Sequence, residues 1–414
     1  MVQLDASWLQ HVQKPARYTG GEWNSVVKDH KDMDVTMCFG FPDVYEVAMS
    51  HLGIKILYSL LNELPYVAAE RVCAPWHDME EEMRKRNIPL YSLETKTPVK
   101  DFDFLAFTLQ YEMSYTNILN MLDMGGIPFY SKDRDLSFPL ITAGGPCAYN
   151  VEPIADFVDI VNLGESEEHI VEMVELYRQE KAAGFPGGKE GLLRKMAQIP
   201  GNYVPSLYEP QYTEKGDFKG MKVLAEEAPA VVQKRIIEDM DNCFYPTKPV
   251  VPYIDVVHDR AVLELFRGCT RGCRFARPVC YIVRCVNVHQ KNLVQLAKEI
   301  IANTGYNEIS LMSLSSADYS RLPELVDMLM EEFKDKQVSV SLPSLRIDAF
   351  SIDIAKKVQQ VRKSGLTFAP EAGSQRMRDV INKGVSEEDL IAACTNAFKS
   401  GWNTVKLYFM MGLP

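Results

Sequence analysis

Four of the chain's nine cysteines lie between Cys269 and Cys285. Cys269 and Cys273 stand in the run GCTRGCRF, separated by three residues and each preceded by a glycine that frees the backbone. Two thiolates at this spacing can wrap a metal ion or an iron–sulfur cluster. The arginines at positions 267, 271 and 274 add positive charge, which favours the thiolate form that ligates metals. The segment therefore predicts a metal or iron–sulfur site.

The other five cysteines are scattered along the chain, and the odd total argues against a disulfide framework. The chain carries 45 Lys and Arg against 56 Asp and Glu, a net charge of −11, which repels phosphate backbones and argues against nucleic acid as a partner. No uncharged apolar run approaches the roughly 18–20 residues that a membrane span needs. We therefore expect a cytoplasmic protein without a membrane partner.

The elements that must position the cysteines alternate between strands and helices. In the first half, residues 34–41 read as a buried strand and residues 51–63 as an amphipathic helix with five apolar residues on one face. Further short apolar runs at 103–109, 139–143 and 158–163 are each followed by a glycine turn or a polar helical stretch. Strands that alternate with helices predict βαβ units, so we expect an α/β fold with a Rossmann-like parallel sheet.

A second alternating series contains the cysteines. Its predicted strands are 261–266, 308–313, 337–342, 366–369 and 404–410, and its predicted helices are 291–303, 323–333, 351–363, 375–382 and 387–400. Five such repeats predict a partial (β/α) barrel that is incomplete at its C-terminus. The cysteine run follows the first strand, at the end of the barrel where functional sites collect.

Between the two series the periodicity is lost, and Gly and Pro recur. We predict a first domain over residues 1–184, an extension and linker over 185–257, and a second domain over 258–414.

The chain also resembles a known family. GCTRGCRF is similar to the start of the cluster loop of radical S-adenosylmethionine (SAM) enzymes, whose signature is C-x3-C-x2-C. SLSSADYSRL, SLPSLRIDAF, LTFAPEAGSQRMRDVINKG and VKLYFMMGLP agree with the subfamily in which a cobalamin-binding-type Rossmann domain precedes the radical SAM barrel. PDVYEVAMSHLG, ITAGGPCAYNVEPIADFVD and NLGESEE in the first half are similar too. The resemblance covers nearly the whole chain and implies a [4Fe–4S] cluster and SAM as cofactors.

The sequence departs from the family at the third cysteine, where Ala276 stands. A cluster that leaves one iron open for SAM needs three protein thiolates. We predict that Cys269, Cys273 and Cys280 supply them, although Pro278 restricts how the loop can bend. Cys285 lies five residues beyond Cys280. A protein that keeps the fold without a working cluster remains the alternative.

The resemblance also implies residues that contact SAM, each at the end of a strand of the second series. They are Ser315, Ser316 and Asp318 for the methionine amino group, Arg346 for the carboxylate, and Glu371 and Ser374 for ribose or carboxylate. Ser374 precedes a predicted helix and is equally suited to cap it.

Cobalamin is a further cofactor that the family implies. Cobalamin domains of one type ligate cobalt through an Asp-x-His-x-x-Gly loop, and no Asp precedes His51 at that spacing. We expect His51 to start a helix instead, and cobalamin binding stays open. We expect His169, beside Glu167 and Glu168, on an exposed helix face.

The resemblance thus predicts an enzyme that cleaves SAM reductively and generates a 5′-deoxyadenosyl radical, with a flavodoxin or ferredoxin as reductant. Its substrate and catalytic residues are not named by the sequence. Two alternatives from other classes are a degenerate radical SAM-like scaffold and a protein stabilised by zinc on the clustered thiolates; C-x3-C fits zinc less well than C-x2-C.

Overall fold

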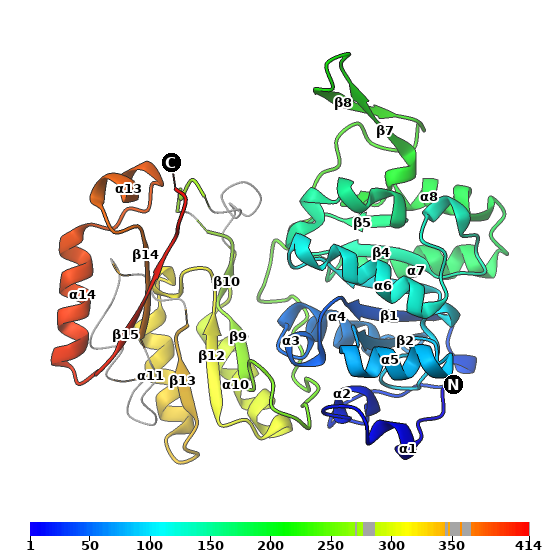
Figure 1. The fold of residues 1–414 in the computed structure, drawn as a ribbon. Helices are drawn as coiled ribbons and strands as arrows, with labels where there is room; N and C mark the ends of the chain where they lie inside the picture. Colours follow the sequence, from blue (N-terminus) through cyan, green and yellow to red (C-terminus); the bar gives the residue numbers. More distant parts are fainter. Residues whose placement is uncertain (270, 276–285, 344–346, 348–356, 358–365, 414) are drawn as a thin grey trace. The chain divides into compact units, whose positions relative to one another are not determined.

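The computed structural model describes residues 1–269, 271–275, 286–343, 347, 357 and 366–413 (Figure 1). The chain divides into two compact units. The N-terminal unit comprises Met1–Ile237 and Phe244–Asp259, and the C-terminal unit comprises Glu238–Cys243 and Arg260–Pro414. The three-segment division that the sequence suggests, at 184/185 and 257/258, stays a prediction.

A six-stranded sheet forms the N-terminal unit, in the order β2-β1-β3-β4-β5-β6 (Figure 1). The strands are β1 (Val35–Phe41), β2 (Val67–Cys73), β3 (Phe104–Thr108), β4 (Leu140–Gly144), β5 (Ile160–Asn162) and β6 (Asn202–Tyr203). The first five run parallel, and β6 is antiparallel to β5. The parallel sheet confirms the predicted α/β fold. From β1 the chain adds strands in both directions, first β2 on one side and then β3, β4 and β5 on the other. Ligands of such sheets bind outside the carboxyl ends of the strands, at the point where the strand order reverses.

Helices cover both faces of this sheet. They are α1 (Ala6–Leu9), α2 (Ala16–Thr19), α3 (Tyr45–Ala48), α4 (Leu52–Glu63), α5 (His77–Arg86), α6 (Tyr115–Gly125), α7 (His169–Ala182) and α8 (Gly188–Met196). Met37 and Phe39 of β1 share one core with residues of α4, α7 and α8, whereas Cys38 shares a second core with residues of α5 and α6. All seven residues of β1 are buried, as expected for a strand covered on both faces.

A two-stranded antiparallel sheet, β7 (Tyr208–Tyr212) and β8 (Phe218–Val223), completes the strands of this unit. The sequence predicts a strand or two only between residues 221 and 237, so β7 is not anticipated. Most of β7 is solvent-exposed, and an exposed strand lacks the apolar run by which a buried strand is recognised.

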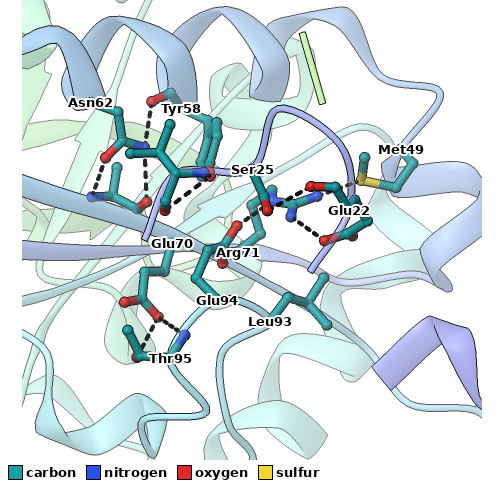
Figure 2. Close-up of polar contacts among 12 residues, drawn as sticks. Glu22, Ser25, Met49, Tyr58, Asn62, Glu70, Arg71, Leu93, Glu94 and Thr95 are labelled. Atoms are coloured by element: carbon teal, nitrogen blue, oxygen red, sulfur yellow. Dashed lines mark hydrogen bonds and ion pairs between the residues drawn. The ribbon is translucent and has the colours of Figure 1, made fainter. Parts of the chain in front are cut away.

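A buried polar network stabilises the N-terminal unit around Arg71 of β2 (Figure 2). The Arg71 Nη2 donates to Glu22 Oε2 at 2.9 Å, and its Nε donates to Glu94 Oε1 at 2.6 Å. Arg71 is 3% exposed, and the Tyr45 hydroxyl donates to Glu22 at 2.9 Å. Burial opposes ionisation of Glu22, but the Arg71 guanidinium more than offsets this, so the pKa of Glu22 lies below its usual value. The network ties four chain segments together, around Glu22, Tyr45, Arg71 and Glu94.

The expectation that His169 is exposed is wrong. His169 is 1% exposed, and its Nε2 lies 2.8 Å from Asn202 Oδ1 on β6. The two preceding glutamates suggest a solvated face, but α7 begins at His169, and its first side chain points at the antiparallel end of the sheet. Burial lowers the pKa of His169 to about 4.

This burial predicts a loss of stability in mild acid. In the unfolded chain the His169 pKa is near 6.5. Below that pH the His169 side chain is therefore protonated in the unfolded state but not in the folded state. The contribution of neutral His169 to the free energy of unfolding is present above pH 6.5 and is lost as the pH falls towards 4. The total loss is on the order of 3 kcal/mol. His169→Gln should therefore flatten the dependence of the free energy of unfolding on pH between 6.5 and 4.5.

Urea titrations at several pH values measure this slope. His11→Gln, a change at an exposed histidine of the same unit, is the matched control and should keep the wild-type slope. Equal slopes for His169→Gln and the wild type would show that His169 does not titrate in this way.

The C-terminal unit contains the second β/α series (Figure 1). β9 (Ala261–Glu264), β12 (Glu308–Met312) and β13 (Ser339–Ser341) form a parallel sheet in the order β13-β12-β9. β14 (Leu366–Glu371) and β15 (Val405–Phe409) form a second parallel pair. These five strands match the five predicted from the sequence. The predicted strand 261–266 is interrupted, because Phe266 and Arg267 form a separate short strand, β10, that pairs with β11 (Val286–Asn287).

Four helices of this unit are described: α10 (Gln290–Thr304), α11 (Leu322–Phe333), α13 (Gln375–Val380) and α14 (Glu387–Lys399). Their formation follows from amphipathic spacing. In α11 the buried residues recur every three or four positions: Leu322, Leu325, Val326, Leu329 and Phe333. The predicted helix 351–363 lies outside the described residues.

Among the residues that the structure describes, no helix is both long enough and apolar enough to cross a membrane.

Candidate functional site

The cysteine loop, defined here by its described residues 268, 269 and 271–275, leaves the barrel-type sheet at the carboxyl end of β9. The short antiparallel pair β10–β11 closes its base, since Phe266 pairs with Asn287 and Arg267 pairs with Val286. The Val288 amide also donates to the Leu265 carbonyl at 3.0 Å. The two strands that flank the loop, Phe266–Arg267 and Val286–Asn287, are therefore held side by side.

Both described cysteines of the loop carry free thiols. Cys273 is 7% exposed, whereas Cys269 is half-buried. Gly268, which precedes Cys269, has a φ of 95°, a conformation that residues with a Cβ rarely adopt. A glycine at this position therefore lets the chain turn sharply into the loop from β10.

A serine-rich segment follows β12, the strand next to β9. The Ser316 Oγ donates to the Leu311 carbonyl at 3.1 Å, and the Ser315 amide donates to Ser313 Oγ at 3.2 Å. Ser315 is 2% exposed, and its Oγ has no hydrogen-bond partner among the described residues. A buried hydroxyl without a partner is unfavourable, and in native structures it often marks a place for a ligand or water.

Asp318, in the same segment, forms an ion pair with the cysteine loop. The Arg271 Nε donates to Asp318 Oδ2 at 3.0 Å, and Arg271 Nη2 also contacts Asp318. Two of the three arginines near the cysteines thus have acidic partners, because Arg267 pairs with Glu264 at 3.0 Å. The Asp318 carboxylate, predicted for the SAM amino group, is directed at Arg271.

The end of β14 supplies the other two described residues of the predicted SAM site. Glu371 has a φ of 66° and pairs with Lys383 at 3.2 Å. The Ser374 Oγ accepts a hydrogen bond from the Met377 amide at 3.3 Å, so Ser374 is the N-cap of α13. The capping role suggested by the sequence is present.

Residues 380–383, which are the last residue of α13 and the three after it and are called the α13 turn below, contact the cysteine loop directly. The Asn382 Nδ2 donates to the Gly272 carbonyl at 2.6 Å, and the Arg274 amide donates to the Ile381 carbonyl at 2.9 Å. The cysteine loop, which follows β9, is thereby joined to the segments that follow β12 and β14.

The remaining predicted site residues, Cys280 and Arg346, lie outside the described residues, as do Ala276 and Cys285. Within the described part of the chain, no group of three or more His, Cys, Asp or Glu side chains could hold a metal ion. The donor chemistry of Cys269 and Cys273 fits an iron–sulfur cluster, but two thiolates are one short of the three required. A third must come from residues beyond those described.

In the N-terminal unit, His51 is the N-cap of α4, as expected. Its Nδ1 accepts a hydrogen bond from the Ile54 amide at 3.2 Å, and its ring contacts that of Phe41. Burial lowers the pKa of His51 to about 4. The side chain is thus a neutral, structural group at the carboxyl end of β1.

Sequence reasoning misses Asn382, the contacts of Arg274 with the α13 turn, and the Arg271–Asp318 pair. The run Asn-Lys-Gly at 382–384 does signal the end of a helix. No local pattern, however, indicates that Asn382 reaches Gly272, which lies 110 residues earlier.

Comparisons with known proteins agree with this geometry. Residues 53–205 match the family described as radical SAM proteins, N-terminal, and residues 263–414 match the radical SAM superfamily. An uncharacterized protein of Methanocaldococcus jannaschii is 31% identical over 379 residues, which cover 90% of this chain and 69% of the relative.

Two solved structures share the fold. One is the cobalamin-dependent SAM radical enzyme OxsB with aqua-cobalamin and SAM bound, at a TM-score of 0.60 and 12% identity over 91% of this chain. The other is the radical SAM methyltransferase TsrM of Kitasatospora setae with cobalamin and a [4Fe–4S] cluster bound, at a TM-score of 0.56 and 12% identity over 92% of this chain. This chain spans 49% of OxsB and 70% of TsrM.

Proposed function

Since the chain belongs to the radical SAM superfamily and has the fold of its cobalamin-dependent members, we propose that it binds a [4Fe–4S] cluster and SAM and acts as a radical SAM enzyme. When bound, such a cluster supplies one electron to SAM, whose cleavage yields methionine and a 5′-deoxyadenosyl radical that abstracts hydrogen from a substrate. We propose a flavodoxin or ferredoxin as the source of that electron.

The observation that carries the proposal is the position of Cys269 and Cys273. Both thiols lie on a loop whose base is closed by β10–β11, at the point where the ends of three strands meet. Sites of parallel α/β architectures collect at this end. Cys269 and Cys273 would hold two irons, and we propose Cys280 as the third ligand.

Ser315 is the best-supported contact for SAM. Its buried Oγ lacks a partner among the described residues, so a polar group of a ligand would satisfy it. Asp318 and Glu371, in contrast, already pair with Arg271 and Lys383. We propose that these two carboxylates act in SAM binding mainly by holding the side chains of Arg271 and Lys383 in place. Ser316, Ser374 and Arg346 stay proposed contacts of SAM.

For cobalamin, the loop after β1 lacks the Asp-x-His-x-x-Gly motif by which one type of cobalamin domain ligates cobalt. The Nδ1 of His51 is engaged with the Ile54 amide, and the ring is packed against Phe41. We therefore assign no step to cobalamin.

A protein that keeps this fold without a working cluster is the second proposal. The observation that favours it is Ala276 at the position of the family's third cysteine. Anaerobic reconstitution with iron and sulfide separates the two. The enzyme should take up about four irons and four sulfides per chain and, with dithionite and SAM, release methionine and 5′-deoxyadenosine. A chain that stays colourless and leaves SAM intact would contradict the proposed enzyme.

Ser315→Ala gives a sharper test of the SAM site. Because the Ser315 Oγ has no hydrogen-bond partner among the residues that the structure describes, removing it should leave the stability of the ligand-free protein unchanged or raise it by about 1 kcal/mol. The same change should weaken SAM binding about tenfold, measured by calorimetry on the reconstituted protein.

Ser320→Ala, an exposed position in the same segment, should change neither quantity. If Ser315→Ala lowered stability and left SAM affinity intact, Ser315 would be a structural residue.

A further inference from the structure

We propose that Asn382 is a positioning residue that orients Cys273 for metal binding. The inference rests on the proposed cluster at Cys269 and Cys273. It concerns the contacts by which the α13 turn holds the cysteine loop before any metal binds.

The α13 turn contacts the peptide groups on both sides of Cys273. On one side, the Gly272 carbonyl accepts a hydrogen bond from Asn382 Nδ2 at 2.6 Å. On the other, the Arg274 amide donates to the Ile381 carbonyl at 2.9 Å. With both flanking peptide planes fixed, the direction of the Cα–Cβ bond of Cys273 is fixed as well, so the thiol is confined to the positions that rotation about this bond allows.

Two side-chain contacts reinforce this attachment. The Arg274 Nη1 donates to the Val380 carbonyl at 2.7 Å, and the Lys383 Nζ lies 5.8 Å from the centre of the Phe275 ring. The Arg271–Asp318 pair holds the preceding part of the loop from the β12 side. The cysteine loop is thus attached to the ends of two different strands.

The α13 turn is itself well anchored, which makes it suited to position another segment. Arg378 is 1% exposed, and its guanidinium donates to the carbonyls of Val385 and Ala372 at 2.9 Å each. These contacts join the end of α13 to the residues after β14. Hydrogen bonds to a rigid neighbour lower the conformational freedom that a metal ligand loses when it binds.

The residue types at both ends of the contact fit this role. Asn382 has a φ of 53°, a left-handed conformation that asparagine adopts more readily than most residues. A Cβ on Gly272 would lie 2.9 Å from Asn382 Nδ2, closer than real Cβ contacts. A side chain at position 272 would therefore displace the amide of Asn382 from its present position.

Two substitutions of Asn382 remove the hydrogen bond in different ways. Asn382→Asp keeps the shape but replaces the donor by a carboxylate oxygen that faces the Gly272 carbonyl. Asn382→Gly removes the side chain and suits the left-handed backbone. Asn87→Gly is the matched control, since Asn87 also has a φ of 53°, ends α5 and lies in the N-terminal unit.

Hydrogen exchange on the full-length, iron-free chain measures the contact itself. In both Asn382 variants, the amides of residues 271–275 should exchange about five- to tenfold faster than in the wild type, as expected for the loss of one hydrogen bond. Asn87→Gly should leave them unchanged. Equal exchange in all four proteins would overturn the inference, whatever the iron content.

Iron uptake then measures the consequence. After anaerobic reconstitution, both Asn382 variants should bind iron about tenfold more weakly than the wild type, and their residual reduced cluster should give an altered EPR spectrum. Faster exchange with unchanged iron affinity and spectrum would show that Asn382 holds the loop without positioning a ligand, and would also overturn the inference.

A double substitution adds a test of the contact between positions 272 and 382. Gly272→Ala should impair iron uptake because its new Cβ displaces Asn382. In the Asn382→Gly background the same substitution should have little further effect. Additive effects would contradict the proposed contact. If the wild type bound no iron, the proposed function would be wrong. Hydrogen exchange would still show whether Asn382 orders the cysteine loop.

Discussion

Cys273→Ala, and equally Cys269→Ala, should reduce the iron and sulfide content of the reconstituted protein to background. A [4Fe–4S] cluster of this type depends on three protein thiolates, and loss of one leaves too few ligands to hold it. The measurement is iron and acid-labile sulfide per chain, with the broad visible absorption of the cluster as a second readout. Cys394→Ala, at a partly buried free cysteine on α14 of the same unit, is the matched control and should keep full iron content.

The third ligand can be identified by the same measurement. If Cys280 completes the set, Cys280→Ala should abolish the cluster absorption and Cys285→Ala should leave it. If neither completes it, the wild type should bind iron poorly, and Ala276→Cys should raise the iron content. Full occupancy in a chain that lacks both Cys280 and Cys285 would contradict our assignment of ligands.

Arg71→Met should lower the free energy of unfolding of the N-terminal unit by about 3–5 kcal/mol. Arg71 neutralises two carboxylates, Glu22 and Glu94, whose side chains are 2% and 0% exposed. Without the guanidinium, both acids stay buried with no cation between them, and either ionisation or protonation there is unfavourable. Chemical denaturation followed by circular dichroism gives the change.

Arg178→Met is the matched control for Arg71→Met. The Arg178 side chain is 37% exposed and pairs with Glu175 at 3.0 Å and with Asp34 at 3.3 Å. Surface pairs of this kind contribute at most about 1 kcal/mol. If both substitutions had similar effects, the Arg71 network would not be the stabilising core that its burial indicates.

The two stability arguments concern different chemistry. Loss of His169 should make stability less dependent on pH, because that residue resists protonation when it is folded. Loss of Arg71 should lower stability across the neutral range, because the pKa of the buried Glu22 lies below its usual value and this carboxylate is ionised there. Measuring both variants over the same pH range separates a titrating buried group from a permanent buried charge.

The sequence by itself determined the alternation of strands and helices and the family of the chain. Periodicity is a local property, so the strands near 34–41, 308–313 and 404–410 could be predicted to within a few residues. The cysteine run was equally visible, because its residue types and spacing lie within one short segment. Exposed elements such as β7 were missed, since they lack an apolar signature.

Only the tertiary structure decided which distant residues meet. Asn382 reaches Gly272, and Asp318 pairs with Arg271, because parallel strands bring their carboxyl ends together and the loops that follow them become neighbours. His169 is buried for a similar reason, since α7 begins against the end of the sheet. Side-chain partners depend on the packing of segments far apart in the chain, and neither composition nor spacing contains that information.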